Sequence, residues 1–180
     1  MLIEENPGDR VMAFVDLRNV MQSDLVRTRR DQGWEIDLVS LVRSLPGNRR
    51  LVGVYAFDTL RRHDDGFIQG LSLVRALRFQ GFRVIAPTDE PDEPGTQKEA
   101  DVMLATEMLV QAFQGTFDVA IVVSGDRDFI PAIRAVQNLG RRVEVAALQG
   151  TYTSKLVESA DRFHIVDELP FLRPSEEVPA

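Results

Sequence analysis

Polar side chains that could bind a metal ion or a phosphate group follow two apolar runs of the sequence. The runs cover residues 11–15 and 119–123, and each passes directly into a short polar stretch. The polar residues in these stretches are Asp16, Asn19, Ser124, Asp126 and Asp128. A further pair, Lys98 and Asp101, begins a long segment of helical periodicity, where a spacing of three places both on one helix face.

The four aspartates in these groups predict a metal site. Four clustered carboxylates repel one another and raise one another's pKa values unless a cation lies among them. The chain has no cysteine and two histidines without ligand spacing, so the available ligands are oxygens, which favour Mg²⁺ or Mn²⁺ over Zn²⁺. Such an ion activates water and neutralises a phosphoryl group, which predicts cleavage of a phosphodiester. The predicted metal ligands are Asp16, Asp101, Asp126 and Asp128.

Two other polar residues would support this chemistry. Asn19 and Ser124 could orient the water or the phosphate by hydrogen bonds. A simpler explanation remains for the aspartates taken singly, because an aspartate before a helix often caps it and an acid in the first turn complements the helix dipole. Ser124-Gly125-Asp126 is also ordinary turn chemistry. The coincidence of all these groups after strands favours a site.

The apolar runs alternate with longer segments of helical period, which predicts a β/α repeat. The predicted strands cover residues 11–15, 51–57, 82–86, 119–123, 143–147 and, more weakly, 163–166. The predicted helices cover residues 36–45, 66–80, 97–114, 129–139 and 154–159. Most of these strands lack strict alternation, as expected when both faces are covered. We therefore expect an α/β fold, with an open parallel sheet of five or six strands and helices on both faces.

Parallel sheets of this kind bind ligands at the carboxyl ends of their strands, where the strand order reverses. The first and fourth predicted strands are the usual neighbours at that point, so the aspartates are expected to converge there. Seven arginines follow the first, second and fourth strands, namely Arg18, Arg27, Arg29, Arg30, Arg61, Arg62 and Arg127. They could track a phosphate backbone. We predict substrate contacts from Arg18, Arg61, Arg62 and Arg127, together with Lys98.

Composition limits the possible classes of protein. The 180 residues carry a net charge of −7, which argues against indiscriminate adhesion to nucleic acid. No uninterrupted apolar stretch is long enough to span a bilayer, and residues 1–5 lack the profile of a signal peptide. Absence of cysteine fits a reducing compartment, so we expect a cytoplasmic protein without membrane contacts. An acidic loop at residues 87–95 would repel RNA, and it could be either a regulatory lid or an inert surface loop.

Three sequence elements resemble the NYN domains of the LabA-like group, which are relatives of the PIN-domain nucleases. These elements are Asp16-x-x-Asn19, Lys98-Glu99-Ala100-Asp101 and Ser124-Gly125-Asp126-x-Asp128-Phe129. The resemblance implies a three-layer, Rossmann-like (PIN-like) fold whose acids hold Mg²⁺ or Mn²⁺ and cleave RNA. It also implies metal-ligand roles for the same four aspartates, with Asn19 and Ser124 as polar supports. Leu17, Glu99 and Arg127 depart from the usual family pattern.

We divide the chain into a lead (residues 1–9), one NYN domain (10–167) and a tail rich in Pro and Glu (168–180). The leading hypothesis is a metal-dependent ribonuclease that acts on single-stranded or locally unpaired RNA. The alternative is a non-catalytic regulatory module that binds RNA or protein, which the acidic loop and the net charge favour. A homodimer or a protein partner remains open in either case. A P-loop and a dinucleotide-binding glycine turn are both absent from the sequence.

Overall fold

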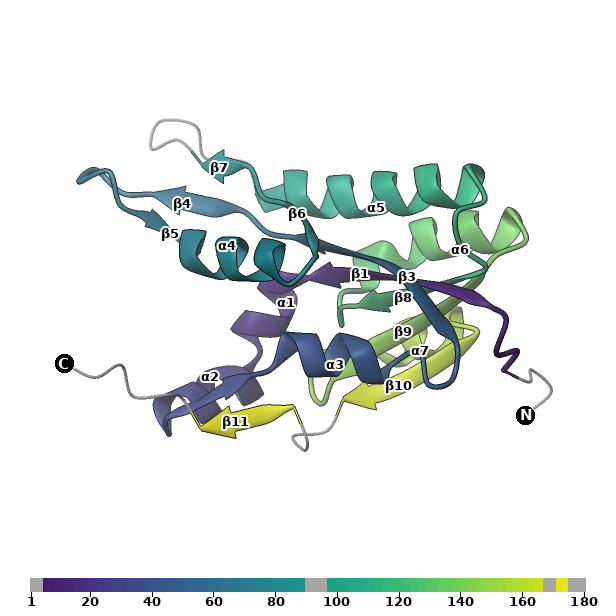
Figure 1. Cartoon of the computed structure of the whole chain (residues 1–180), viewed down its shortest axis with the longest axis horizontal. Helices are drawn as coiled ribbons and strands as arrows, with labels where there is room; N and C mark the ends of the chain where they lie inside the picture. Colours follow the sequence, from purple (N-terminus) through teal and green to yellow (C-terminus); the bar gives the residue numbers. More distant parts are fainter. Residues whose placement is uncertain (1–4, 90–96, 167–170, 175–180) are drawn as a thin grey trace.

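The computed structural model describes residues 5–89, 97–166 and 171–174, and its centre is a six-stranded sheet (Figure 1). Across the sheet, the strands are β10 (Arg162–Val166), β9 (Arg142–Leu148), β8 (Val119–Val123), β1 (Arg10–Asp16), β3 (Arg50–Phe57) and β6 (Arg83–Ile85). Every neighbouring pair is parallel. The chain runs from β1 outward to β3 and β6, then returns to β8 on the other side. The strand order therefore reverses between β1 and β8, as the sequence predicts.

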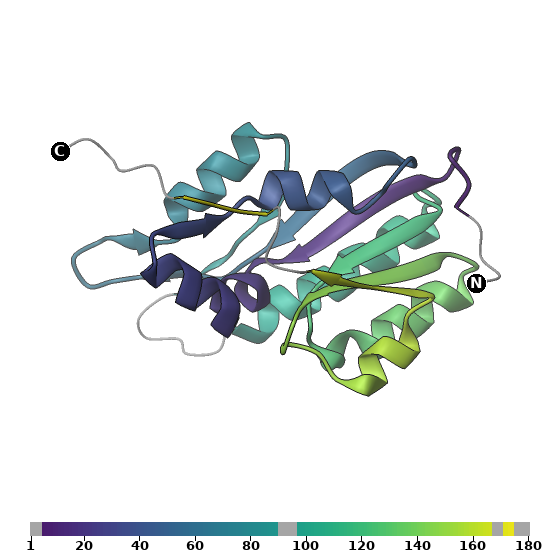
Figure 2. The ribbon, with the colours of Figure 1, turned by 90° about the horizontal axis from the view of Figure 1, so that it is seen from below.

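Helices cover both faces of the sheet and complete a three-layer α/β fold (Figures 1 and 2). One face packs against α1 (Leu17–Gln22), α2 (Asp24–Asp31), α3 (Leu38–Ser44) and α4 (Leu71–Phe79). The opposite face packs against α5 (Gln97–Phe113), α6 (Ile130–Asn138) and α7 (Ser154–Ser159). A short 3₁₀ turn, η1 (Arg127–Phe129), precedes α6.

The central strand explains why the apolar runs lack alternation. Val11, Ala13 and Val15 belong to the core on the α3 side, whereas Met12 and Phe14 belong to the core on the α5 side. Successive side chains of a strand point to opposite faces, so a strand buried on both faces must be apolar throughout. Burial on both sides holds β1 in place, and this packing also positions the residues that directly follow the strand.

The structure adds elements that the sequence patterns did not predict. Two helices, α1 and α2, follow β1, where the sequence patterns predicted no helix. The helix expected over residues 66–80 begins only after Gly70, whose φ of 88° suits glycine better than other residues. Residues 68–69 instead form β5 (Ile68–Gln69), which pairs with β4 (Leu60–Arg62) beside β7 (Thr88–Asp89).

A second small sheet joins β2 (Trp34–Ile36) to β11 (Leu172–Pro174) in antiparallel register. The segment assigned to the tail thus contributes a strand, and the backbone N–H of Asp37 donates a hydrogen bond to the carbonyl of Phe171. The acidic loop lies outside the described residues from position 90 onward. Among the residues that the structure describes, no helix is both long enough and apolar enough to cross a membrane.

Candidate active site

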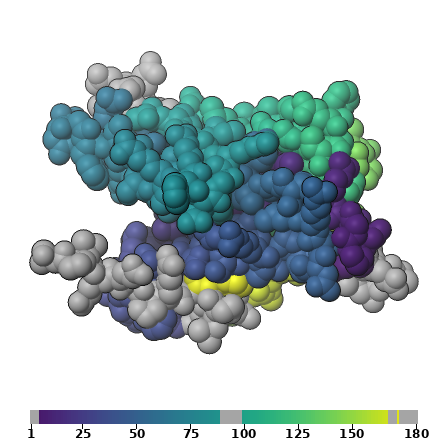
Figure 3. Space-filling model, in the orientation of Figure 1, coloured from purple at the N-terminus to yellow at the C-terminus, as the bar shows by residue number. Residues whose placement is uncertain are grey.

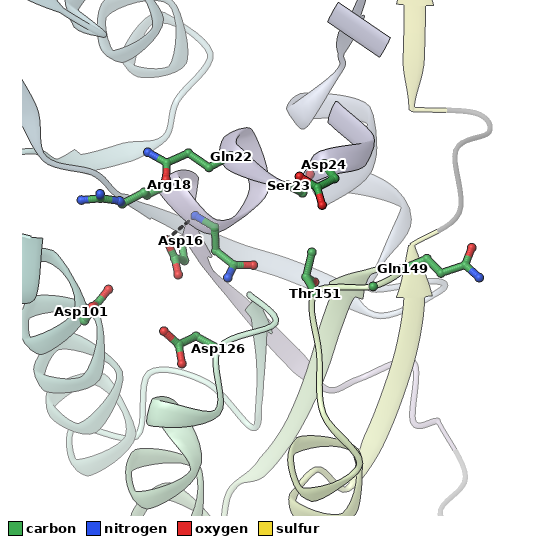
Figure 4. Close-up of a pocket in the computed structure, with 11 residues that line it drawn as sticks. Asp16, Arg18, Gln22, Ser23, Asp24, Asp101, Asp126, Gln149 and Thr151 are labelled. Atoms are coloured by element: carbon green, nitrogen blue, oxygen red, sulfur yellow. Dashed lines mark hydrogen bonds between the residues drawn. The ribbon is translucent and has the colours of Figure 1, made fainter. Parts of the chain in front are cut away.

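A pocket of about 520 Å³ lies at the carboxyl ends of β1 and β8, where the strand order reverses (Figure 4). Four carboxylates line it, including that of Asp24 at the start of α2. Asp16 ends β1, Asp101 lies in the first turns of α5, and Asp126 lies in the turn between β8 and η1. Arg18 and Asn19 from α1 complete this part of the wall. The expected convergence of β1, α5 and the β8 turn is therefore observed for three of the four predicted aspartates.

Asp16 is held by hydrogen bonds to both carboxylate oxygens. Its Oδ1 accepts from the backbone N–H of Asn19 at 3.0 Å, which caps α1, and its Oδ2 accepts from the Ser124 hydroxyl at 2.9 Å. Only 7% of Asp16 is exposed. Asp16 therefore caps α1 and lines the pocket at the same time, and its capping role does not exclude a functional one.

One further hydrogen bond joins α1, directly after β1, to the turn after β8, and a second lies within that turn. The side-chain Oδ1 of Asn19 accepts from the backbone N–H of Gly125 at 2.9 Å. The hydroxyl oxygen of Ser124, itself buried, accepts from the backbone N–H of Asp126 at 3.1 Å. Asn19 and Ser124 thus act as positioning residues that fix the two acidic segments against each other.

Two carboxylates of the pocket, those of Asp16 and Asp101, have raised pKa values. The pKa of Asp16 is raised to about 6. Burial is the largest cause, the nearby charges of Asp101 and Asp126 add to it, and the hydrogen bonds from Asn19 and Ser124 oppose it. The pKa of Asp101 is also raised, chiefly by burial and then by Asp126, while Arg18 opposes the change. The pocket therefore holds more negative charge than its positively charged residues compensate.

Asp128 occupies a different position from the other three acids. It is exposed in η1, and its backbone N–H donates a hydrogen bond to Oδ1 of Asp126 at 2.9 Å. Its carboxylate does not line the pocket, although its charge still contributes to the raised pKa of Asp101. Asp126 caps η1, and this cap directs Asp126 and Asp128 to different surroundings.

The chemistry of these donors fits a hard divalent cation, because carboxylates that raise one another's pKa values become more favourable beside a positive charge. The carboxylates are, however, too far apart to coordinate one ion together. Within residues 5–89, 97–166 and 171–174, no three Asp, Glu or His side chains are close enough together to hold a metal ion. The predicted four-aspartate metal cluster is thus not formed, and a cation would have to draw the carboxylates together.

Comparison with known proteins identifies the family. The model of the NYN domain matches residues 10–167. The chain belongs to the NYN domain family. NYN domains are PIN-like nucleases, which supports a nuclease function, an RNA substrate and the use of divalent metal ions in general terms.

A solved structure shares the fold of this NYN domain. The crystal structure of a protein of unknown function from Vibrio parahaemolyticus superposes with a TM-score of 0.68 at 20% sequence identity, covering 92% of this chain and 98% of that chain. At this identity, the likeness extends to the fold alone. No curated protein matches the sequence.

The predicted basic contacts of the NYN domain fall into two groups. Arg18 lines the pocket, and its charge lowers the pKa values of Asp101 and of Asp58. Arg127 is exposed on η1, while Arg61 and Arg62 are exposed on β4, outside the pocket lining. The side chain of the remaining predicted contact, Lys98, lies outside the described part of the chain.

Sequence reasoning missed several residues at this edge of the NYN domain. Asp58 directly follows β3, and burial raises its pKa. The rule that located Asp16 would have located Asp58, because both follow a strand of the same sheet. Thr151, beyond β9, also lines the pocket and lies so close to Gly125 that a Cβ on this glycine would be 2.3 Å from its carbonyl oxygen. Only structure could reveal that contact.

Proposed function

We propose that this NYN domain is a metal-dependent ribonuclease that hydrolyses phosphodiester bonds of single-stranded or locally unpaired RNA in the pocket. The observation that carries the proposal is the gathering of Asp16, Asp101 and Asp126, from three different elements, around one pocket. The raised pKa values of Asp16 and Asp101 support the proposal, because perturbed pKa values are typical of functional sites.

Each residue would have a definite role. Asp16, Asp101 and Asp126 would hold Mg²⁺ or Mn²⁺, with Asp128 as a further ligand from the exposed side of η1. When bound, such an ion supplies an activated water and neutralises charge on the phosphate. Asn19 and Ser124 keep the β1 and β8 carboxylates in place through the hydrogen bonds described above. Arg18, the cation in the pocket wall, would hold the phosphate that is to be cleaved.

We propose a cytoplasmic setting for this reaction, because a cysteine-free chain suits a reducing compartment. A second candidate function is a non-catalytic module that binds RNA or a protein partner, including a second copy of the chain. The observation that favours it is the lack of a formed metal cluster among the described residues, combined with the position of Asp128 outside the pocket.

The deciding experiment compares cleavage of a labelled, unstructured RNA by the wild type, Asp126→Asn and Asp31→Asn. Asp31 is an exposed acid at the far end of α2, so its variant controls for the loss of one charge. Each protein is tested with Mn²⁺, with Mg²⁺ and with chelator. We expect metal-dependent cleavage by the wild type and Asp31→Asn, and a rate at least about 100-fold lower for Asp126→Asn.

A second readout separates metal binding from turnover. Mn²⁺ should raise the melting temperature of the wild type and of Asp31→Asn, because an ion that binds only the folded state stabilises it. The shift should be much smaller for Asp126→Asn. If the wild type neither cleaves RNA nor responds to Mn²⁺, the ribonuclease proposal is wrong and the binding module takes its place.

A further inference from the structure

The hairpin formed by β4 and β5 projects beyond the carboxyl ends of the central strands (Figures 1 and 2). It begins two residues after Asp58, whose pKa responds to Arg18 in the pocket wall, so the hairpin and the pocket belong to the same edge of the sheet. Near its tip, the backbone N–H of His63 donates to the carbonyl of Phe67 at 2.8 Å. In the turn, the side chain of Asp65 accepts from the N–H of Phe67 at 2.9 Å.

The two faces of this hairpin differ in chemistry. Leu60 is buried and Ile68 is partly buried against the core on the α3 side. Since side chains alternate along a strand, the opposite face presents the two pairs that face away from that core. These pairs are Arg61 with Gln69, and His63 with Phe67. Arg61 also pairs through its backbone with Asp89 of β7.

An aromatic pair dominates the outward face. The rings of His63 and Phe67 lie 5.7 Å apart at an angle of 46°, and Phe67 is 61% exposed. Two other phenylalanines are more exposed still, Phe79 at 90% and Phe113 at 82%. These two end α4 and α5, the helices that lead into β6 and β8, so they lie toward the amino ends of the strands. Phe67 differs from them in lying at the carboxyl edge, where Arg61 is on the same face of the hairpin.

We propose that the outward face of the β4–β5 hairpin, composed of Arg61, His63, Phe67 and Gln69, binds one nucleotide of the single-stranded RNA substrate. This inference rests on the proposed function. The base would stack on the ring of Phe67, with His63 supporting the ring from behind. The guanidinium of Arg61 would contact the adjacent phosphate, and the carboxamide of Gln69 would be available to the edge of the base.

The chemistry of this face suits a nucleotide better than a protein. Its apolar part is one aromatic pair, flanked directly by a guanidinium and a carboxamide, and not a continuous apolar surface. A nucleotide requires this combination of a flat apolar ring and a cation nearby. Of the two acids in the turn, Asp65 is engaged by a hydrogen bond from the backbone N–H of Phe67.

The shape of the molecule offers a route from the hairpin to the pocket. Figure 3 shows a hollow between the part of the surface formed by the hairpin with α4 and the part formed by α2. Ser23 and Asp24, at the start of α2, line the pocket. An RNA strand that passes through the pocket would therefore leave it between α2 and the hairpin, with its next bases beside Phe67.

The test measures the affinity of RNA for Phe67→Ala and for the matched control Phe79→Ala. Both variants are made in the Asp126→Asn background, which prevents cleavage, and binding is followed by fluorescence anisotropy with a labelled oligoadenylate of ten nucleotides. We expect Phe67→Ala to weaken binding at least about fivefold, because stacking on one aromatic ring contributes that much per base. Phe79→Ala should bind as the parent does.

Two further binding measurements separate the contact with the base from the contact with the phosphate. With an abasic RNA of the same length, the difference between Phe67→Ala and the parent should vanish, since no base remains to stack. Arg61→Gln should weaken both RNAs alike and reduce the salt dependence of binding, whereas Arg134→Gln, on the exposed side of α6, should do neither.

Failure of this inference can be told apart from failure of the proposed function. If the wild type cleaves RNA but Phe67→Ala and Phe79→Ala bind it equally, the hairpin is not the contact and the ribonuclease proposal stands. If the parent binds no RNA and the wild type cleaves none, both proposals are wrong. If Phe67→Ala alters self-association in sedimentation and leaves RNA affinity unchanged, the hairpin is a protein interface and our inference is overturned.

Discussion

At the two edges of the central sheet, the pKa values of aspartate side chains are shifted in opposite directions. At the carboxyl edge, burial raises the pKa of Asp16 to about 6, and three other aspartates line the same pocket. At the amino edge, hydrogen bonds from Arg10 lower the pKa of Asp118 to about 2, and Arg141 lies 3.3 Å away. The difference lies in the partners and not in the residue type. Aspartates at one edge are compensated by arginines, whereas those at the other are left in excess.

A buried acid in the amino half of the sheet strengthens this contrast. Burial would raise the pKa of Glu144, but hydrogen bonds from His164 and from Arg49 outweigh it and hold the pKa at about 2. Arg49 reaches both carboxylate oxygens of Glu144, at 2.5 and 2.9 Å. The fold can therefore pair a buried carboxylate well where it needs stability, so the excess of acid at the pocket indicates a different purpose.

The largest expected effect comes from breaking the buried ion pair between Arg49 and Glu144. Arg49→Met removes the guanidinium from Glu144, and with it two hydrogen bonds to a buried carboxylate, which should lower the free energy of unfolding by about 3–5 kcal/mol. Urea unfolding at pH 7 measures it. Arg50→Met, at the exposed neighbouring position, should change stability by less than about 0.5 kcal/mol. Equal losses in the two variants would mean that the Arg49–Glu144 pair is not the cause.

On the pocket side, Gly125→Ala should disturb the site sterically. The new Cβ would lie 2.3 Å from the backbone carbonyl oxygen of Thr151, and relief of that overlap requires the turn after β8 to move, at about 1–3 kcal/mol. We expect that loss in urea unfolding, together with loss of Mn²⁺-induced stabilisation. Gly53→Ala is the control, because its Cβ would meet only the flexible end of Met12, at 3.3 Å. A Gly125→Ala protein as stable as Gly53→Ala would contradict the close approach.

The raised pKa of Asp16 predicts a gain of stability from a mutation in the pocket. A carboxylate whose folded pKa is about 6, against 3.8 when unfolded, stabilises the fold while protonated and loses that contribution as the pH rises through 6. Asp16→Asn should therefore be about 2 kcal/mol more stable than the wild type at pH 7 without metal. The difference should disappear below pH 4. A variant less stable than the wild type at both pH values would contradict an uncompensated charge at Asp16.

The smallest effect, of opposite sign, is expected from Asp118→Asn. The lowered pKa of Asp118 means that its stabilisation is present above 3.8 and is lost as the pH falls toward 2. The variant should be less stable than the wild type at pH 7 and indistinguishable from it near pH 2. Solvent screens this partly exposed pair, so the change should be smaller than that at Asp16. Thermal unfolding at both pH values would show that Asp16→Asn and Asp118→Asn change the stability in opposite directions at pH 7.

Much of the site could be predicted because the rule that places it is simple. Parallel strands carry their carboxyl ends to one edge, so Asp16 and Asp126 had to lie near each other once β1 and β8 were neighbours. Asp101 followed from the helix that packs across β1. Asp128 could not be resolved in this way, because the cap that Asp126 forms on η1 decides where each acid points.

The elements that escaped prediction lack a clear apolar period. No helix was predicted over residues 24–31, but Ser23 caps them, and Val26 is buried against the core as part of α2. The hairpin strands β4 and β5 are two or three residues long, too short to show alternation. Contacts made in the folded state, and not local propensity, determine these pieces.

The pairing of β11 with β2 has a consequence for the order in which the domain is completed. During synthesis, β2 leaves the ribosome early, while its partner strand follows more than a hundred residues later. The central sheet can form in that interval, because β10 precedes β11. The small sheet beside α2 is consequently completed after the central sheet. A nascent NYN domain would have its acids in place before this antiparallel pair forms.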